Sequence, residues 1–238
     1  MKNIIAAIAE EKAYIADRMQ GIETSLIARL EQYGYTSLDP YFVDKMDYLF
    51  SQVEFNVVEE LMPKGVGEIF NMLNTNKAGV LLVDWEDTYV VCADRGIKEF
   101  NQQYCEEHGI TFFPLYTGGG TIVGSVGDFS FGVCTPKNVV KSSSYILNKV
   151  RDILQKYTDK SVTINGNDIC VDGKKISGTA NYTKGDVFMV ILHFSFGDHS
   201  ELISNICTTA KESKSITYVD FMTRSELKKE VLLWLCKE

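Results

Sequence analysis

Two separated segments carry residues whose types and spacing could do chemistry. The first is a run of three glycines, Gly118–Gly120, flanked by Thr117 and Thr121. The second combines Asn167-Asp168-Ile169 with Lys175-Ile176-Ser177-Gly178. Glycines lack a Cβ, so this loop can adopt positive φ and press its amides against a ligand. A lysine among short residues can aim its ammonium at a phosphate or an activated carbonyl. Together the two segments predict a nucleotide-assisted acyl-transfer site.

Each feature also has a simpler structural explanation. The glycine run could be a tight loop between strands, and Lys175 could be a solvated hairpin lysine like Lys174. His193 lies in an apolar stretch, where a histidine more often satisfies a core hydrogen bond than performs catalysis. Asp168 could belong to turn chemistry, and Arg95 could face water. These alternatives stay open at the level of the sequence.

The N-terminal part of the chain is predicted to be helical. An apolar stripe at steps of seven, four and three contains Ile8, Ile15, Met19, Ile22, Leu26 and Leu30. Gly34 ends this helix, and Asp39-Pro40 is typical of the start of another, which we expect to run to Leu61. Pro63 and Gly65 would stop it. Residues 1–65 are therefore predicted to form a helical segment, whose stripe would serve core packing or a homodimer contact.

From about Gly79 the pattern predicts short strands alternating with helices. Strands are expected over 80–83, 88–92, 111–113, 128–134, 161–164, 168–171, 175–181 and 186–196, and helices over 97–107, 137–157 and 199–210. Asp172-Gly173 between apolar runs predicts a hairpin turn. Thr223-Arg224-Ser225-Glu226 predicts a capping box at the start of a final helix. Residues 66–238 are therefore predicted to form an α+β domain with a mixed or antiparallel sheet flanked by helices.

Composition limits the classes of function. The 238 residues are 45% hydrophobic, which suffices for a sizeable core. The net charge of −8 disfavours a nucleic-acid binder, because phosphate contacts need a basic face. No apolar run approaches the length of a bilayer span, and charges at Glu10 and Glu11 interrupt the N-terminal apolar stretch too early for a signal peptide.

The cysteines and histidines predict neither a disulfide framework nor a zinc site. Six cysteines are scattered without a Cys-x-x-Cys pair, and three histidines include no His-x-x-x-His pair. Reduced thiols and a cytoplasmic location are the expectation. Cys170 lies beside Asp168, and a neighbouring carboxylate raises the pKa of a thiol, so thiol catalysis is disfavoured.

Several segments occur in an order that can be compared with a known family. They are Val90–Arg95, Glu106–Ile110, Gly118–Gly120, Asn167–Ile169, Lys175–Gly178 and Leu192-His193. In this order they resemble the biotin/lipoate ligase superfamily, and lipoate–protein ligases most closely. The resemblance implies a two-step reaction. ATP would activate lipoate or an octanoate-like acid to an acyl-adenylate, and the acyl group would pass to a lysine of a lipoyl-carrier protein domain.

The resemblance also implies roles for individual residues. Lys175 would be catalytic, and Asp168 would hold Mg²⁺ through the nucleotide. The residues implied to bind the acid or the nucleotide are Arg95, Thr117, Gly118, Gly119, Gly120, Thr121, Asn167, Asp168, Ser177, Gly178 and His193. Phe113, Phe129 and Phe131 are candidates for an apolar slot that accepts an aliphatic chain.

The chain departs from the family pattern at two places. Phe113-Pro114-Leu115-Tyr116 precedes the glycine run where the family has an arginine, and Gly124-Ser125 stand where it has His-Asp. An arginine fork holds a carboxylate or phosphate with two bonds, so its loss is not conservative. The alternative function is therefore a catalytically degenerate member of the fold that binds a ligand or a partner.

Overall fold

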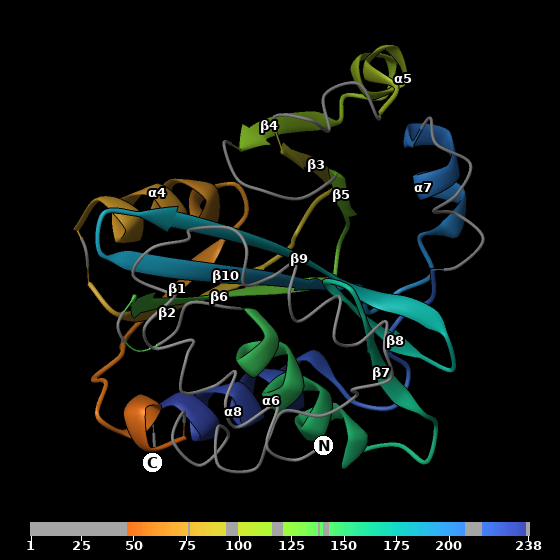
Figure 1. Ribbon diagram of the computed structural model, residues 1–238. Helices are drawn as coiled ribbons and strands as arrows, with labels where there is room; N and C mark the ends of the chain where they lie inside the picture. Colours follow the sequence, from red (N-terminus) through yellow and green to blue (C-terminus); the bar gives the residue numbers. More distant parts are fainter. Residues whose placement is uncertain are drawn as a thin grey trace.

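A seven-stranded sheet occupies the centre of the structure (Figure 1). The computed structural model describes residues 47–75, 77–93, 100–115, 121–137, 139, 143–207 and 216–236. The strands are β1 (Asn56–Leu61), β2 (Gly79–Asp84), β3 (Tyr89–Ala93), β4 (Thr111–Leu115), β5 (Thr121–Gly124), β6 (Phe129–Pro136), β7 (Val162–Asn165), β8 (Asp168–Val171), β9 (Lys174–Lys184) and β10 (Val187–Phe194). The helices are α4 (Lys64–Thr75), α5 (Gln102–Glu107), α6 (Ser143–Gln155), α7 (Ser200–Ile206) and α8 (Arg224–Cys236).

Both sheets of the described structure are mixed. The large sheet has the order β1-β2-β6-β10-β9-β8-β7, in which β1 and β2 run parallel and the other neighbours antiparallel. The small sheet has the order β4-β3-β5, with β3 parallel to β4 and antiparallel to β5. The predicted α+β class with a mixed sheet flanked by helices is confirmed.

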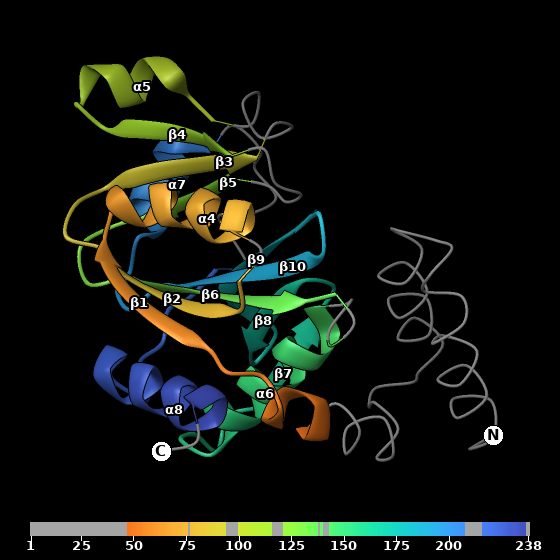
Figure 2. The ribbon, with the colours of Figure 1, turned by 90° about the vertical axis from the view of Figure 1, so that its left-hand side faces the viewer.

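The elements form layers on the two faces of the large sheet (Figures 1 and 2). Helices α6 and α8 cover one face and enclose a core with Phe129, Phe131 and Phe194. Helix α4 and the small sheet with α5 and α7 lie on the other face. Strand β10 pairs on both sides and is covered on both faces, so all of its residues are buried.

Two local predictions, the hairpin turn at Asp172-Gly173 and the capping box at Thr223, are confirmed. Asp172 and Gly173 have φ of 49° and 77°, the positive values that a tight hairpin turn between β8 and β9 requires. At the start of α8, the Glu226 N–H donates to Thr223 Oγ1 at 3.2 Å and the Thr223 N–H donates to Glu226 Oε2 at 2.7 Å. This reciprocal pair is the predicted capping box.

Two predictions for the region before β2 are wrong. Residues 56–61 form β1 rather than the end of a helix, because parallel pairing with β2 outweighs local helix preference. The large sheet therefore begins upstream of the domain boundary predicted at residue 66. Pro63 and Gly65 do not stop a helix but accompany the start of α4. Proline is tolerated in a first turn, and a Cβ at Gly65 would lie 2.7 Å from Val83 Cγ2, so glycine lets α4 approach β2.

Some helix boundaries also differ from the prediction. Helix α5 begins at Gln102, after Asn101 caps it, and α6 begins at Ser143 rather than at residue 137. Lys137 instead donates its N–H to Asp186, which joins the ends of β6 and β10. The N-terminal stripe over residues 8–30 lies outside the described residues. Among the residues that are described, no helix combines the length and apolar character needed to span a membrane.

We expect Thr223→Ala to lower the free energy of unfolding by about 1 kcal/mol, because the variant loses the side-chain cap of α8. Urea unfolding followed by circular dichroism measures this difference. Ser225→Ala is the matched control, since Ser225 is an exposed residue of the same turn. Equal losses in the two variants would contradict a specific contribution from the cap.

Candidate functional site

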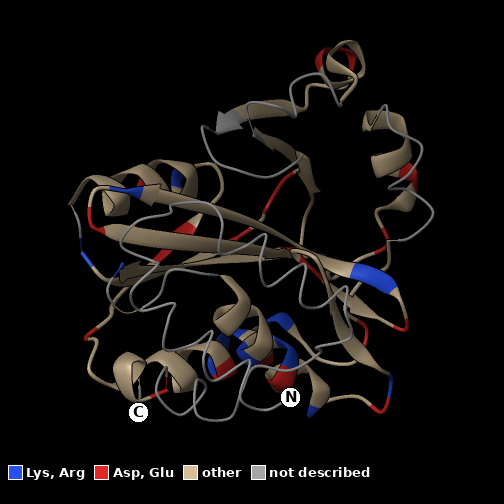
Figure 3. Ribbon diagram, viewed as in Figure 1, with Lys and Arg blue, Asp and Glu red and all other residues tan. Residues whose placement is uncertain are grey.

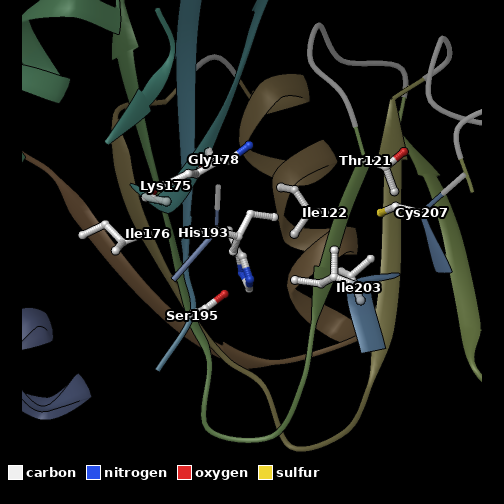
Figure 4. A pocket seen from close by; sticks show the side chains of 12 residues that line it. Thr121, Ile122, Lys175, Ile176, Gly178, His193, Ser195, Ile203 and Cys207 are labelled. Atoms are coloured by element: carbon white, nitrogen blue, oxygen red, sulfur yellow. Dashed lines mark hydrogen bonds between the residues drawn. The ribbon is translucent and has the colours of Figure 1, made fainter. Parts of the chain in front are cut away.

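A pocket lies between the large sheet and the layer formed by β5 and α7 (Figure 4). Its lining residues are Thr121, Ile122, Val123, Lys175, Ile176, Ser177, Gly178, His193, Ser195, Ile203, Cys207 and Ile216. Strands β9 and β10 supply one wall, and β5 and α7 supply the opposite wall. The cavity volume is about 50 Å³, close to the share of one or two water molecules. An acyl chain therefore fits only if lining side chains move.

Lys175 enters this pocket from the start of β9, where Figure 3 shows a basic stretch in blue. Its Nζ lies 3.1 Å from Asp168 Oδ1 on β8, and the two side chains are 29% and 37% exposed. A pair this exposed is stabilised only weakly, because water screens it. A ligand phosphate or carboxylate could therefore replace Asp168 as the partner of the ammonium at small cost.

Gly178 gives the lysine its path across the strand. A Cβ at Gly178 would lie 3.5 Å from Lys175 Cε and 3.6 Å from Nζ, so the aliphatic end of Lys175 runs close over the glycine. Gly178 is directly opposite His193 in the β9–β10 ladder. The ammonium and the imidazole are thus brought to neighbouring positions of the same pocket.

A buried chain of polar side chains lies behind His193. The Trp85 Nε1–H donates to Ser130 Oγ at 2.9 Å, and Ser130 Oγ lies 3.0 Å from His193 Nδ1. Because the indole can only donate, the Ser130 hydroxyl can donate its own hydrogen to Nδ1 of a neutral ring. In that tautomer the ring proton lies on Nε2, which faces Asp128 Oδ2 at 3.5 Å. That distance is long for a hydrogen bond, and Nε2 has no closer partner among the described residues.

Asp128 is fully buried and is the acceptor for several donors. Oδ1 accepts from the Phe196 N–H at 3.0 Å and lies 2.9 Å from His199 Nε2, while Oδ2 accepts from the Ser125 N–H at 2.9 Å. Burial alone raises the pKa of Asp128, but its interactions with the two histidines, His193 and His199, and with the Ser125 N–H together outweigh burial, so the pKa lies well below its usual range. The carboxylate is ionised at neutral pH.

The structure brings together several of the predicted site residues and leaves others apart. Lys175, Ser177, Gly178, His193 and Thr121 line the pocket, and Asp168 joins them through Lys175. Asn167 is exposed in the β7–β8 turn and does not line it. Arg95, Thr117 and Gly118–Gly120 lie outside the described residues. His193 is buried and bonded, as expected of a core histidine, and it is also a pocket residue.

None of the three aromatic residues predicted to form an apolar slot lines the pocket. Phe129 and Phe131 are fully buried in the core against α6 and α8, on the other face of the large sheet. Phe113 packs on Tyr89, with ring centroids 5.7 Å apart, and does not line the pocket. Successive side chains of a strand point to opposite faces of the sheet. Because Ser130 faces Trp85 and His193, its neighbours Phe129 and Phe131 face the core beside α6 and α8.

The sequence analysis assigned no role to Asp128, Ser130 or His199, which form the polar network with His193 and are not among the lining residues. Asp128 and His199 are 71 positions apart, so no local spacing connects them. The one available signal was an aspartate placed directly before an apolar strand, where a buried carboxylate demands partners.

Of the six cysteines, Cys207 lines the pocket and four others are buried. Burial, with a smaller contribution from Asp168, raises the pKa of Cys170, and burial raises that of Cys134 to about 11. Raised pKa values disfavour the nucleophilic thiolate. The described residues contain no cluster of three His, Cys, Asp or Glu side chains that could hold a metal ion.

Comparison with known proteins identifies the family. The family model of the lipoyl protein ligase A/B catalytic domain matches residues 68–227, so the chain belongs to that family. The predicted membership of the biotin/lipoate ligase superfamily, nearest to lipoate–protein ligases, is confirmed. Over 125 residues the chain is 30% identical to lipoate-protein ligase LplJ of Bacillus subtilis. That match covers 50% of this chain and 38% of the relative, so it spans well under half of the relative's length.

Solved structures share the fold at low sequence identity. The bipartite lipoate protein ligase of Thermoplasma acidophilum, described with its E2 lipoyl domain, superposes with a TM-score of 0.65 at 17% identity, over 78% of this chain and 84% of that one. A lipoate-protein ligase A bound with ATP gives 0.64 at 14% identity, over 78% and 85%. At these identities the likeness establishes the fold.

We expect Gly124→Ala to lower the free energy of unfolding by about 1–3 kcal/mol, as overpacking does. Its Cβ would lie 2.5 Å from Trp85 Cζ3 and 2.7 Å from His193 Cε1, so both rings must shift. Gly67→Ala on the open face of α4, with nothing within 4 Å, should instead raise stability by up to about 1 kcal/mol. Urea unfolding compares the two variants, and a neutral Gly124→Ala would contradict close packing of β5 on the network.

Proposed function

We propose that this protein activates lipoate or a similar short acyl acid with ATP and transfers it to a lysine of a lipoyl-carrier domain. In the first step the acid carboxylate attacks the α-phosphorus, and the bond to pyrophosphate breaks. In the second, the carrier amine attacks the acyl carbonyl, AMP leaves, and the amine loses a proton. The observation that carries the proposal is Lys175, which lines a pocket in a chain of this family and has a weakly held carboxylate partner.

Lys175 would act by electrostatic stabilisation. Negative charge develops on the phosphate during activation and on the carbonyl oxygen during transfer. A preorganised cation near these positions is the kind of interaction that contributes most to such rate enhancements. Because Asp168 holds the ammonium at 3.1 Å before a ligand arrives, the lysine is already oriented along β9 over Gly178.

The described donors fit a magnesium ion held mainly by nucleotide phosphates. Mg²⁺ commonly uses one or two carboxylates together with substrate phosphates rather than a cage of protein ligands. Asp168 is the carboxylate beside the lysine, and it would be the protein ligand. The ion would neutralise phosphate charge, while Lys175, once released from Asp168, would face the reacting oxygens.

The partners of the proposal follow from the relatives. One structural relative is bound to ATP and another is described with its E2 lipoyl domain, which supports a nucleotide and a carrier domain as partners here. The scattered cysteines, which include no Cys-x-x-Cys pair, support a cytoplasmic location. A homodimer through the N-terminal helical segment stays a prediction.

The second candidate is a member of the fold that binds a ligand without activating it. Two observations favour it: no arginine occurs over residues 113–116, before the glycine run, and the pocket holds only about 50 Å³. Such a protein would bind an acyl acid or a partner and release no pyrophosphate.

Pyrophosphate release with ATP and Mg²⁺, tested with lipoate, octanoate and biotin, separates the two candidates. With the preferred acid, we expect Lys175→Ala to slow release by about 10²–10³-fold, the usual cost of removing one such donor. Lys174→Ala is the matched control, because Lys174 is the exposed neighbour on the same strand. Carrier acylation, followed by mass spectrometry, tests the second step.

The outcomes point in different directions. Release that both variants retain would remove Lys175 from the catalytic machinery. No release with any acid, from protein whose circular dichroism shows a fold, would favour the binding protein, and calorimetric titration with the same acids would then identify its ligand.

A further inference from the structure

The Asp128 carboxylate connects three segments that are far apart in sequence. Oδ2 receives the Ser125 N–H at the end of β5, at 2.9 Å. Oδ1 receives the Phe196 N–H after β10, at 3.0 Å, and His199 Nε2 directly before α7, at 2.9 Å. Oδ2 also faces His193 of β10 at 3.5 Å. One fully buried side chain therefore links the large sheet to the ends of two other elements.

Those two elements carry the wall of the pocket that faces Lys175. Strand β5 contributes Thr121, Ile122 and Val123, and α7 with the residue after it contributes Ile203 and Cys207. Figure 4 shows Ile122, Ile203 and Cys207 on the side opposite the lysine. The wall belongs to the layer on the face of the large sheet opposite α6 and α8. Its distance from β9 and β10 therefore depends on the contacts that hold β5 and α7 against that face.

We propose that Asp128 and His199 are positioning residues of the acid-binding pocket, which fix the β5–α7 wall against the large sheet and thereby set the affinity for the acid. The inference rests on the proposed function for the identity of the ligand. Neither residue needs to touch the acid. Asp128 affects the acid-binding pocket through β5, because it accepts the Ser125 N–H at the end of that strand. It also acts through α7, because it binds His199, the residue directly before that helix.

The pair has a defined electrostatic window. The hydrogen bond to Asp128 raises the pKa of His199, and the nearby negative charge of Asp198 raises it further, whereas burial lowers it. The pKa of Asp128 is depressed. The groups that face His199 are thus Asp128 from the turn before β6, Asp198 beside it, and His193 of β10 through the shared carboxylate. Stabilisation by His199 is present below its ordinary pKa and is lost as pH rises through the raised value, while that of Asp128 is lost only in acid.

The wall should therefore loosen on the alkaline side. Calorimetric titration with lipoate and with octanoate, from pH 6 to pH 9, measures the dissociation constant. We expect wild-type affinity to fall by about tenfold across the titration of His199, the size of an ordinary coupling between sites. His199→Gln keeps a neutral donor and cannot titrate, so its affinity should stay constant with pH. His108→Gln replaces the exposed C-cap residue of α5 and should leave the wild-type pH profile unchanged.

Amide hydrogen exchange over residues 121–125 and 200–206 gives a readout that requires no ligand. We expect faster exchange in Asp128→Asn and in His199→Gln at low pH, relative to wild type, with exchange in β8 and α8 unchanged. If the Asp128 variant does not fold, the His199 variant carries the test alone.

The two proposals fail in different ways. If wild type binds neither acid, the proposed ligand is wrong, and exchange in the wall still decides whether Asp128 and His199 hold it. If acid binds with the same pH profile in wild type and His199→Gln, or if exchange in the wall is unchanged in both variants, the positioning role is overturned.

Discussion

The complete burial of β10 is the constraint on which the site depends. This strand pairs with β6 and β9, and both of its faces are covered, so every polar group on it must find a partner inside the protein. His193 is the one histidine on the strand; Ser130 Oγ is the partner of its Nδ1, and its Nε2 faces the Asp128 carboxylate at 3.5 Å. Asp128 in turn requires donors of its own and takes them from Ser125, Phe196 and His199. The buried carboxylate beside this ring thus connects the strand to the segments that form the opposite wall of the pocket.

The pocket combines two ion pairs of different character. Lys175 and Asp168 are about a third exposed, and water screens such a pair, so a ligand can exchange for either partner at small cost. Asp128 is fully buried and the His199 side chain is 14% exposed, and removing one partner of a buried charge leaves it uncompensated, which is strongly unfavourable. The first pair is suited to change partners during a reaction, and the second is suited to persist through it.

The sequence predicted the parts of the structure that are specified locally. The Asp172-Gly173 turn and the capping box at Thr223 depend on contacts within a few residues, and both were found. The proximity of Asp168 and Lys175 can also be predicted locally, because a short hairpin places β8 next to β9. Strand β1 was missed because its conformation comes from pairing with β2. The contact between Asp128 and His199 was equally out of reach, because the whole fold must form before the two side chains meet.

The absence of a His-Asp pair at Gly124-Ser125 can be explained by the groups that surround these two positions in the structure. The resemblance leads one to expect a histidine and an aspartate at these positions. A Cβ on Gly124 would lie 2.7 Å from His193 Cε1, so the imidazole of another strand already fills that space. The Ser125 N–H donates to Asp128, so a carboxylate also lies beside the second position. The chain therefore has an imidazole and a carboxylate next to β5, supplied from β10 and from the turn before β6, and a Cβ at position 124 would crowd the Trp85 indole at 2.5 Å as well as this imidazole.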